Sequence, residues 1–319
     1  MQLPYDRTCP VIHDNDTVID VYTEDYLMAL ASAGDIRLVG LITSSSIQPY
    51  NKYVPAHDFE SDLPISPTRL NFVKNRAHGV KLARASGLRN IPDPILGVRG
   101  HLEKPASGRI EDTQPHDSPG TRLIIEHARQ ATQDKPLVLV MGGTLSVAAD
   151  AYLLDPTIAD RMVIAWLGGD ADSMGDYNGA ADWWSSYIVA QRLRLVQFPN
   201  GQAMPLVPRS CLVELPDRPL RQWLIEKRHP RQVAHEHDGD GQPAVALMRP
   251  DYVLEIKRKS FSHWGISTGI AVPTEPIPYF KDDDNGNIWV VTRADQSVGT
   301  EEWWRAMKNP AAWHDLNAS

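Results

Sequence analysis

Short apolar runs alternate with amphipathic stretches along the first half of the chain. The apolar runs, each the length of one buried strand, lie at 36–44, 95–98, 137–141 and 162–167. The stretches between them carry apolar residues at helical spacing and lie at 71–86, 121–133 and 145–154. Strands that alternate with helices at this spacing predict βαβ units with right-handed crossovers. We therefore expect an α/β fold with an open, mostly parallel (Rossmann-like) sheet flanked by helices.

The last third of the chain has a more mixed pattern. A helix around Trp223 and another at 244–248 precede the final strands. The pair Asn285-Gly286 separates the segments PYFKDDD and NIWVVT, and because Asn-Gly is favoured in tight turns we predict a hairpin here. No internal repeat or low-complexity linker is visible, so we predict a single domain over residues 1–319.

Acidic residues crowd the segment PVIHDNDTVIDVYTEDYLMAL near the N-terminus. They are Asp14, Asp16, Asp20, Glu24 and Asp25. So many neighbouring carboxylates repel one another unless a cation or a proton relieves them. Oxygen-rich clusters suit hard ions such as Ca2+ or Mg2+, and open α/β sheets bind ligands at the carboxyl ends of their strands. Each residue alone is more typical of a solvated loop or a helix start, but the set predicts a metal site.

Composition narrows the function classes. The chain has 319 residues, 42% of them apolar, a formal net charge of -8 and a pI near 5.7. Without a basic face, binding to nucleic acid or to a membrane surface is not expected. The two cysteines, Cys9 and Cys211, are too few for a disulfide framework, and no secretory signal or membrane-length apolar run is visible. We expect a soluble, cytoplasmic protein.

The DNDTV segment has two interpretations. It matches DxDx[TV], the short signature of haloacid-dehalogenase phosphatases, with LITSSS as the hydroxyl motif and GGDADSMGD as the late acidic motif. Under this interpretation the protein is a Mg2+ phosphohydrolase with Asp14 as nucleophile and Asp16 as acid. The motif is generic, and no lysine stands convincingly before the late acidic motif.

The second interpretation covers most of the chain. DND with EDYLMALA resembles the family motif DxDPGxDDAxAL, with about four extra residues, and VGLITSSS resembles the GITT block. LVLVMGGTLSVAADAYLLDPTIADRMVIAWLGGD is similar to a long family block, and GDYNGAADWW and DGQPAVALMRPDYV follow in the family's order. Over roughly residues 10–255 the sequence resembles the inosine-uridine-preferring nucleoside hydrolases.

The resemblance implies a Ca2+ site. Asp16 aligns with the aspartate that binds Ca2+ and activates the attacking water, and Asp25 aligns with a second carboxylate ligand. Leu145 falls on the residue that contributes a backbone carbonyl. Asp240 is the candidate for the distant carboxylate ligand, with Asp238 as its rival. Cleavage of an N-glycosidic bond would then be a single, inverting displacement through an oxocarbenium-like state.

The resemblance also implies residues around the sugar. Asp14 aligns with a supporting aspartate and Glu24 with an aspartate that holds the ribose hydroxyls. The family clamps the far end of the sugar with two asparagines and a glutamate, where this chain has Asp176 (with Asn178 nearby), Trp184 and Asp182. Since ionised aspartates only accept hydrogen bonds, we expect free glycosides to be favoured over nucleoside 5'-phosphates.

The expected ligand is thus a small nucleoside-like glycoside, and the resemblance also implies a homodimer or homotetramer. A third hypothesis remains beside the two enzymes: a non-catalytic relative that binds a sugar or nucleoside without turning it over.

Overall fold

The computed structural model describes residues 2–16, 22–45, 72–226, 236–266 and 276–315. Within them, nine strands form one sheet in the order β3-β2-β1-β4-β5-β6-β9-β7-β8. The strands are β1 (Pro10–Asn15), β2 (Arg37–Ser45), β3 (Pro94–Arg99), β4 (Leu137–Met141), β5 (Met162–Leu167), β6 (Arg194–Phe198), β7 (Val253–Ile266), β8 (Pro276–Asp282) and β9 (Ile288–Ala294). Neighbours from β3 through β9 pair in parallel, while β7 pairs antiparallel with β9 and β8. The predicted α/β fold with a mostly parallel sheet is confirmed.

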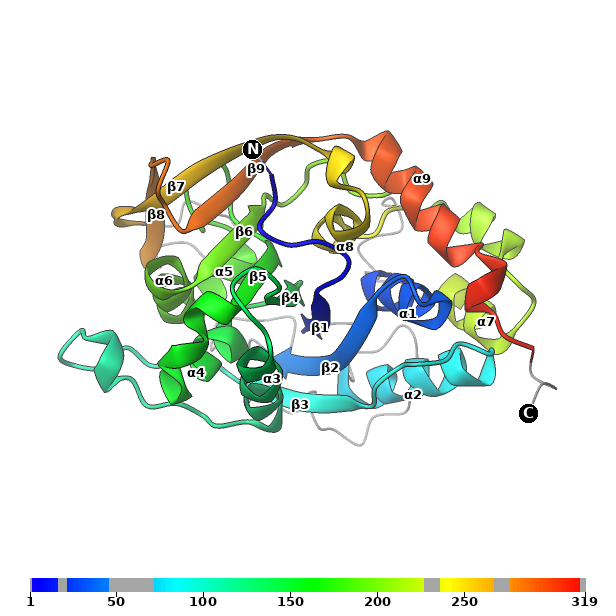
Figure 1. Ribbon diagram of the computed structural model, residues 1–319, viewed down its shortest axis with the longest axis horizontal. Coiled ribbons are helices and arrows are strands. Elements are labelled where there is room, and N and C mark those ends of the chain that lie inside the picture. Colours follow the sequence, from blue (N-terminus) through cyan, green and yellow to red (C-terminus); the bar gives the residue numbers. More distant parts are fainter. Residues whose placement is uncertain (1, 17–21, 46–71, 227–235, 267–275, 316–319) are drawn as a thin grey trace.

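Helices cover both faces of the sheet (Figure 1). They are α1 (Thr23–Ala33), α2 (Phe72–Ala85), α3 (Pro119–Gln130), α4 (Ser146–Leu154), α5 (Tyr177–Ala181), α6 (Trp183–Arg192), α7 (Pro219–Glu226), α8 (Gly241–Met248) and α9 (Gln296–Met307). Short 3-10 helices lie at Ile110–Asp112, Pro156–Arg161, Arg209–Glu214, Pro250–Tyr252 and Pro310–Ala312. In the described ranges, no helix is both long enough and apolar enough to cross a bilayer.

Two hydrophobic clusters lie on opposite faces of the sheet, because successive side chains of a strand point to opposite faces. Val11 and Val138 join a cluster with α1, α2, α7, α8 and α9, whereas Ile12 and Leu139 join one with α3, α4 and α6. Most residues of the central strands are buried. The continuous apolar runs in the sequence predicted this burial, because parallel strands in such a fold are covered on both faces.

Local side-chain chemistry sets the helix ends. The helix predicted at 121–133 begins two residues earlier, because Ser118 accepts a hydrogen bond from the Thr121 amide (3.1 Å) and Pro119 occupies the first turn. Helix α4 ends at Leu154. Asp155 then caps the following 3-10 helix by accepting a hydrogen bond from the Thr157 amide (3.1 Å).

The hairpin predicted at Asn285-Gly286 is wrong. A turn does form there, with the Gly286 amide bonded to the Asp283 carbonyl (2.8 Å), but β8 and β9 do not pair with each other. Both pair instead with the long strand β7, which pairs with β9 along its first half and with β8 along its second half. An Asn-Gly pair predicts a turn, but it does not determine which strands pair with each other.

Candidate active site

The order in which successive strands are added to the sheet reverses direction between β1 and β4. The chain leaves β1 for β2 and β3 on one side, whereas β4 is followed by β5 and β6 on the other. In open α/β sheets such a switch point opens a crevice at the carboxyl ends of the two strands. Asp14 and Asn15 end β1 at this place and Asp16 follows, while Gly142-Gly143 follow the end of β4.

Two carboxylates rest on the glycine turn after β4. A Cβ atom on Gly142 would lie 2.2 Å from Oδ2 of Asp240, and one on Gly143 would lie 3.0 Å from Cγ of Asp16. Side chains at either glycine would therefore displace a carboxylate. Asn15 also holds Asp240, since its Nδ2 donates a 2.7 Å hydrogen bond to Oδ2. The structure thus brings together Asp16 and Asp240, which lie far apart in the sequence.

Asp238 has a different environment from Asp240. Its carboxylate is fully buried and accepts hydrogen bonds from the Tyr22 amide (3.0 Å), the Thr23 hydroxyl (2.7 Å) and the Trp303 indole (3.2 Å). These donors tie Asp238 to the start of α1 and to α9. The geometry therefore favours Asp240 over Asp238 as the carboxylate that faces the crevice.

The other oxygen donors of the expected Ca2+ site come from α1 and from the turn before α4. Asp25 is buried in the first turn of α1, and the Leu145 carbonyl accepts a hydrogen bond from the Ala149 amide (3.0 Å). Hard oxygen ligands of this kind fit Ca2+ chemically. Among the side chains that the structure describes, however, no three His, Cys, Asp or Glu groups are arranged to hold an ion.

Asp14 lies deeper than Asp16. It is 2% exposed, and burial raises the pKa of its carboxyl to about 7, with the nearby Asp16 charge acting in the same direction. The Ser44 hydroxyl and the Arg76 guanidinium oppose this increase. A carboxyl with this pKa exchanges a proton readily near neutral pH, which suits a group that supports acid–base chemistry.

Asp176 and Asn178 follow the carboxyl end of β5. Asp176 caps α5 by accepting a 2.9 Å hydrogen bond from the Gly179 amide, and burial raises its pKa to about 6. The Asn178 amide donates to the carbonyls of Gly142 (3.0 Å) and Leu167 (3.1 Å), so it joins the ends of β4 and β5. Both residues therefore lie at the same edge of the sheet as Asp16.

Asp182 and Trp184 are turned into the protein. Asp182 is 1% exposed and accepts hydrogen bonds from the Ser146 hydroxyl (2.6 Å), the Ser185 hydroxyl (2.5 Å) and two backbone amides. Trp184 is 2% exposed, donates to Thr113 (3.0 Å) and stacks on Tyr187. The bond from Ser146 places Asp182 beside the turn that follows β4, because Ser146 comes directly after Leu145.

Comparison with known proteins decides the fold family. No protein-family model matches the sequence, and no curated protein matches it either. Solved structures do match: a plant nucleoside hydrolase (15% identity, TM-score 0.62, covering 95% of this chain and 99% of that one) and an inosine-guanosine nucleoside hydrolase (14%, 0.62, 94% and 99%). The type III effector protein XopQ, complexed with adenosine diphosphate ribose, matches at 10% identity and TM-score 0.59 over 97% of this chain and 96% of its own. The chain has the nucleoside hydrolase fold.

Within this nucleoside hydrolase fold, Arg76 is a site residue that the sequence reasoning missed. It is 1% exposed and forms an ion pair with Glu24, while its Nη1 donates to the carbonyls of Asn15 (3.3 Å) and Ile42 and to the Thr43 hydroxyl (3.3 Å). One guanidinium thus joins α1, α2 and the ends of β1 and β2. The sequence did contain one signal for Arg76. This arginine lies four residues before the buried Val80, and residues at this spacing share one face of a helix, here the apolar face.

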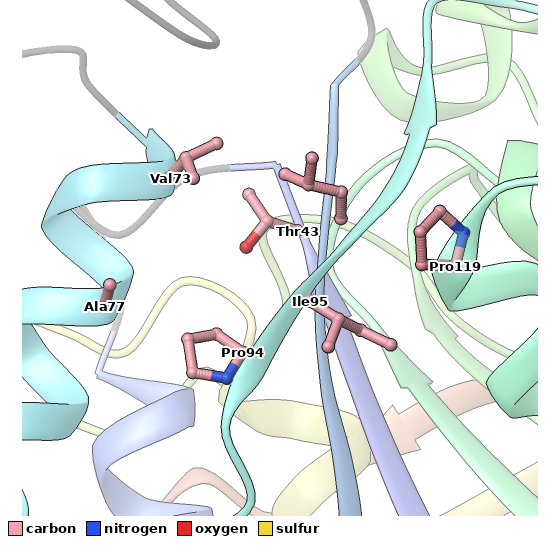
Figure 2. A pocket seen from close by; sticks show the side chains of 7 residues that line it. Thr43, Val73, Ala77, Pro94, Ile95 and Pro119 are labelled. Carbon is pink, nitrogen blue, oxygen red and sulfur yellow. The ribbon is translucent and has the colours of Figure 1, made fainter.

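A cavity of about 300 Å³ is lined by residues of α2, α3, β2 and the first half of β3. Figure 2 shows Val73 and Ala77 from α2, Thr43 from β2, Pro94 and Ile95 from β3, and Pro119 from α3 around it. Its lining is mainly apolar, with the Thr43 hydroxyl as a polar group, so it can accommodate a partly apolar group.

Proposed function

We propose that this protein hydrolyses the N-glycosidic bond of a nucleoside or a related riboside. The observation that carries the proposal is the packing of Asp16 and Asp240 on the Gly142-Gly143 turn, at the β1–β4 switch point of a nucleoside hydrolase fold. Carboxylates there can bind polar groups of a small ligand and accept a proton from water.

The proposed mechanism assigns each residue one task. Asp16 accepts the proton of the attacking water, and Asp16, Asp25, Asp240 and the Leu145 carbonyl would hold a Ca2+ ion. A bound Ca2+ would lower the pKa of that water and orient it. Asp14, buried below Asp16, supports the charge balance, while Glu24 contacts the sugar hydroxyls. Asp176 and Asn178 border the far end of the sugar.

The proposal is tested by assaying release of reducing sugar from inosine, uridine and their 5'-phosphates, with Ca2+ or with EDTA. We expect Ca2+-dependent cleavage of the free nucleosides. Asp16→Asn should reduce kcat by about 100-fold or more, which is typical for loss of a general base. Asp284→Asn, in an exposed turn, is the matched control and should behave like the wild type. Failure to cleave any N-glycoside with Ca2+, Mg2+ or Mn2+ would contradict the proposal.

A non-catalytic binder is the second candidate. The residues Asp182 and Trp184 favour it, because they stand where the family resemblance implies a glutamate and an asparagine, so the far end of the sugar meets different groups. The match to XopQ, whose structure contains adenosine diphosphate ribose, also supports a ligand of this class. Calorimetry with adenosine diphosphate ribose and with ribose separates the candidates, since a binder gives heat without any cleaved product.

The phosphohydrolase interpretation has less support. A nucleophilic Asp14 must reach a phosphorus atom, but this side chain is 2% exposed. Release of phosphate from p-nitrophenyl phosphate with Mg2+ would revive this interpretation. We also propose that residues 1–319 form one domain that assembles as a homodimer or homotetramer, which light scattering would measure.

A further inference from the structure

Three buried polar groups lie at the ends of β1 and β2: the Asp14 carboxylate, the Ser44 hydroxyl and Nη2 of Arg76, on residues that are 2%, 1% and 1% exposed. Ser44 acts on the Asp14 carboxyl through a hydrogen bond, whereas Nη2 of Arg76 has no partner in the part of the chain that the structure describes. Buried polar groups in proteins are almost always hydrogen-bonded, so this donor calls for a bound water or ligand group.

The three groups are close neighbours. Asp14 pairs with Ile42 across the β1–β2 ladder, and Ser44 is two residues farther along β2, so its side chain points to the same face as Ile42. The Ile42 carbonyl accepts a hydrogen bond from Nη1 of Arg76, which places the guanidinium at the same point. The charge of Arg76 and the hydroxyl of Ser44 both influence the Asp14 carboxyl, as expected for groups in proximity.

The position of the unpaired Nη2 is fixed by the other atoms of the guanidinium. Nε is paired with Glu24, and Nη1 is bonded to Asn15, Ile42 and Thr43. Because the guanidinium is planar and rigid, these contacts leave Nη2 little freedom. A donor held in this way loses little entropy when a ligand binds.

The chemistry of the three groups identifies the partner. Nη2 of Arg76 only donates, an ionised Asp14 only accepts, and Ser44 does both. A phosphate or carboxylate would pair with Arg76 but would repel Asp14, whereas a hydroxyl can accept from the first and donate to the second. A sugar hydroxyl therefore satisfies all three groups.

We propose that Arg76 is a specificity-determining residue, which recognises one ring hydroxyl of the substrate sugar through Nη2, together with Ser44 and Asp14. This inference rests on the proposed function and assigns to it a residue outside the carboxylate set. It distinguishes a riboside from the deoxyriboside that lacks the recognised hydroxyl.

The test compares three substrates, a riboside and its 2'-deoxy and 3'-deoxy analogues, in the wild type and in Arg76→Lys. Lysine keeps the positive charge but loses the planar fork that positions Nη2. We expect kcat/KM for the riboside to fall by about tenfold or more, as for loss of a hydrogen bond to a charged group. The analogue without the recognised hydroxyl should be cleaved by both enzymes at similar rates, because it never made the contact.

Controls separate recognition from folding. Arg194→Lys changes another partly buried arginine, which donates to the carbonyls of Gln133 (3.1 Å) and Asp160 (3.3 Å) and begins β6 at the opposite edge of the sheet. It should leave the ratio of riboside to deoxyriboside activity unchanged. If Arg76→Lys does not fold, Ser44→Ala tests the same hydroxyl with a smaller change and should shift the ratio in the same direction. An equal loss on all three substrates, or no change in the ratio, would overturn the inference.

Binding measurements keep this inference distinct from the proposed reaction. Calorimetry is carried out with D-ribose, 2-deoxy-D-ribose and 3-deoxy-D-ribose as probes. In one outcome, no glycosidic bond is cleaved, but Arg76→Lys weakens binding of ribose and leaves binding of one deoxy sugar unchanged. This outcome rejects the proposed reaction and supports the role of Arg76. If nucleosides are cleaved but Arg76→Lys does not discriminate among the sugars, the reaction stands and the role of Arg76 is rejected.

Discussion

Asp14 and Asp182 are almost equally buried but have opposite surroundings. Asp182, between α4 and α6, accepts four protein hydrogen bonds, which partly offset the effect of burial in raising its pKa. Around Asp14, at the end of β1, Ser44 is the hydrogen-bonding residue that opposes the effect of burial, and the pKa rises to about 7. Burial alone therefore does not mark a functional carboxylate. The number of protein donors that surround it separates a structural carboxylate from one kept for a ligand, a proton or an ion.

The largest expected effect comes from the glycine turn that carries the carboxylates of the β1–β4 edge. In Gly142→Ala the new Cβ would collide with Asp240, so this carboxylate must move. Because displacement of a catalytic group by about 1 Å can cost 100-fold in rate, we expect kcat/KM to fall by about that factor. Gly79→Ala is the control, since its Cβ would meet the Trp223 indole at an ordinary 3.6 Å and alanine favours the helix. Equal activity of Gly142→Ala and Gly79→Ala would show that the turn is not part of the active site.

The second effect concerns stability at the α4–α6 contact. Asp182→Ala leaves the Ser146 hydroxyl and two backbone amides without their acceptor, so we expect the free energy of unfolding to fall by about 3 kcal/mol. Activity per folded molecule should stay within about twofold of the wild type. Asp251→Ala, which loses a half-exposed ion pair with Arg249, should cost less than about 1 kcal/mol. Urea titration and active-site-normalised rates measure both quantities, and a stable but inactive Asp182→Ala would place Asp182 in the site.

A third prediction concerns Ca2+ at the β1–β4 edge. Carboxylates that repel one another in the metal-free protein should bind Ca2+, and Ca2+ at 100 times its Kd would add about 2.7 kcal/mol of stability. EDTA should therefore lower the Tm of the wild type but leave that of Asp16→Asn almost unchanged. Differential scanning calorimetry measures both. The same shift in the wild type and the variant would locate the ion elsewhere.

The smallest effect concerns Asp176, which resembles Asp14 in its raised pKa and Asp182 in its capping role. Its pKa is about 6 in the folded chain against 3.8 normally, so the folded state binds more protons between these values. Stability from this group is therefore complete below about pH 4 and declines as pH rises through about 6. Asp176→Asn keeps an equally good helix cap and removes the decline, so it should be more stable than the wild type at pH 7 and match it at pH 4. If the free energies of unfolding of the two proteins change with pH in the same way, the assignment of this pH dependence to Asp176 is wrong.

The parallel sheet was predictable because each central strand is a short, continuous apolar run between helical stretches. LVLVM at β4 shows this clearly, since all five of its residues are buried. The pairing of β8 and β9 was not predictable, because Asn285-Gly286 favours a turn whether or not the flanking strands meet. Which strands pair depends on β7, a 14-residue strand that pairs with both of them.

The candidate site was predictable as far as chain order and residue type define it. Asp16 and Asp240 both pack on the Gly142-Gly143 turn. The sequence left Asp238 and Asp240 as alternatives, because it does not show that Trp303 and Thr23 donate to Asp238. The burial of Trp184 could not be predicted either, because the sequence does not show that Thr113 and Tyr187 lie beside it. Arg76 was missed because an arginine in an amphipathic helix usually faces water, unless a distant carboxylate such as Glu24 pairs with it.

The contacts of Asp238 also affect how the chain folds. Trp303, near the C-terminus, donates to the same carboxylate that holds the start of α1, and β9 completes the sheet by pairing with β6. Asp238 and Trp303 are both synthesised long after α1, so the start of this helix lacks these contacts while the chain is being made. Contacts of such long sequence separation slow folding and expose unpaired strand edges meanwhile. A nascent chain that stops short of Trp303 thus has its acidic residues without the closing contact that fixes α1.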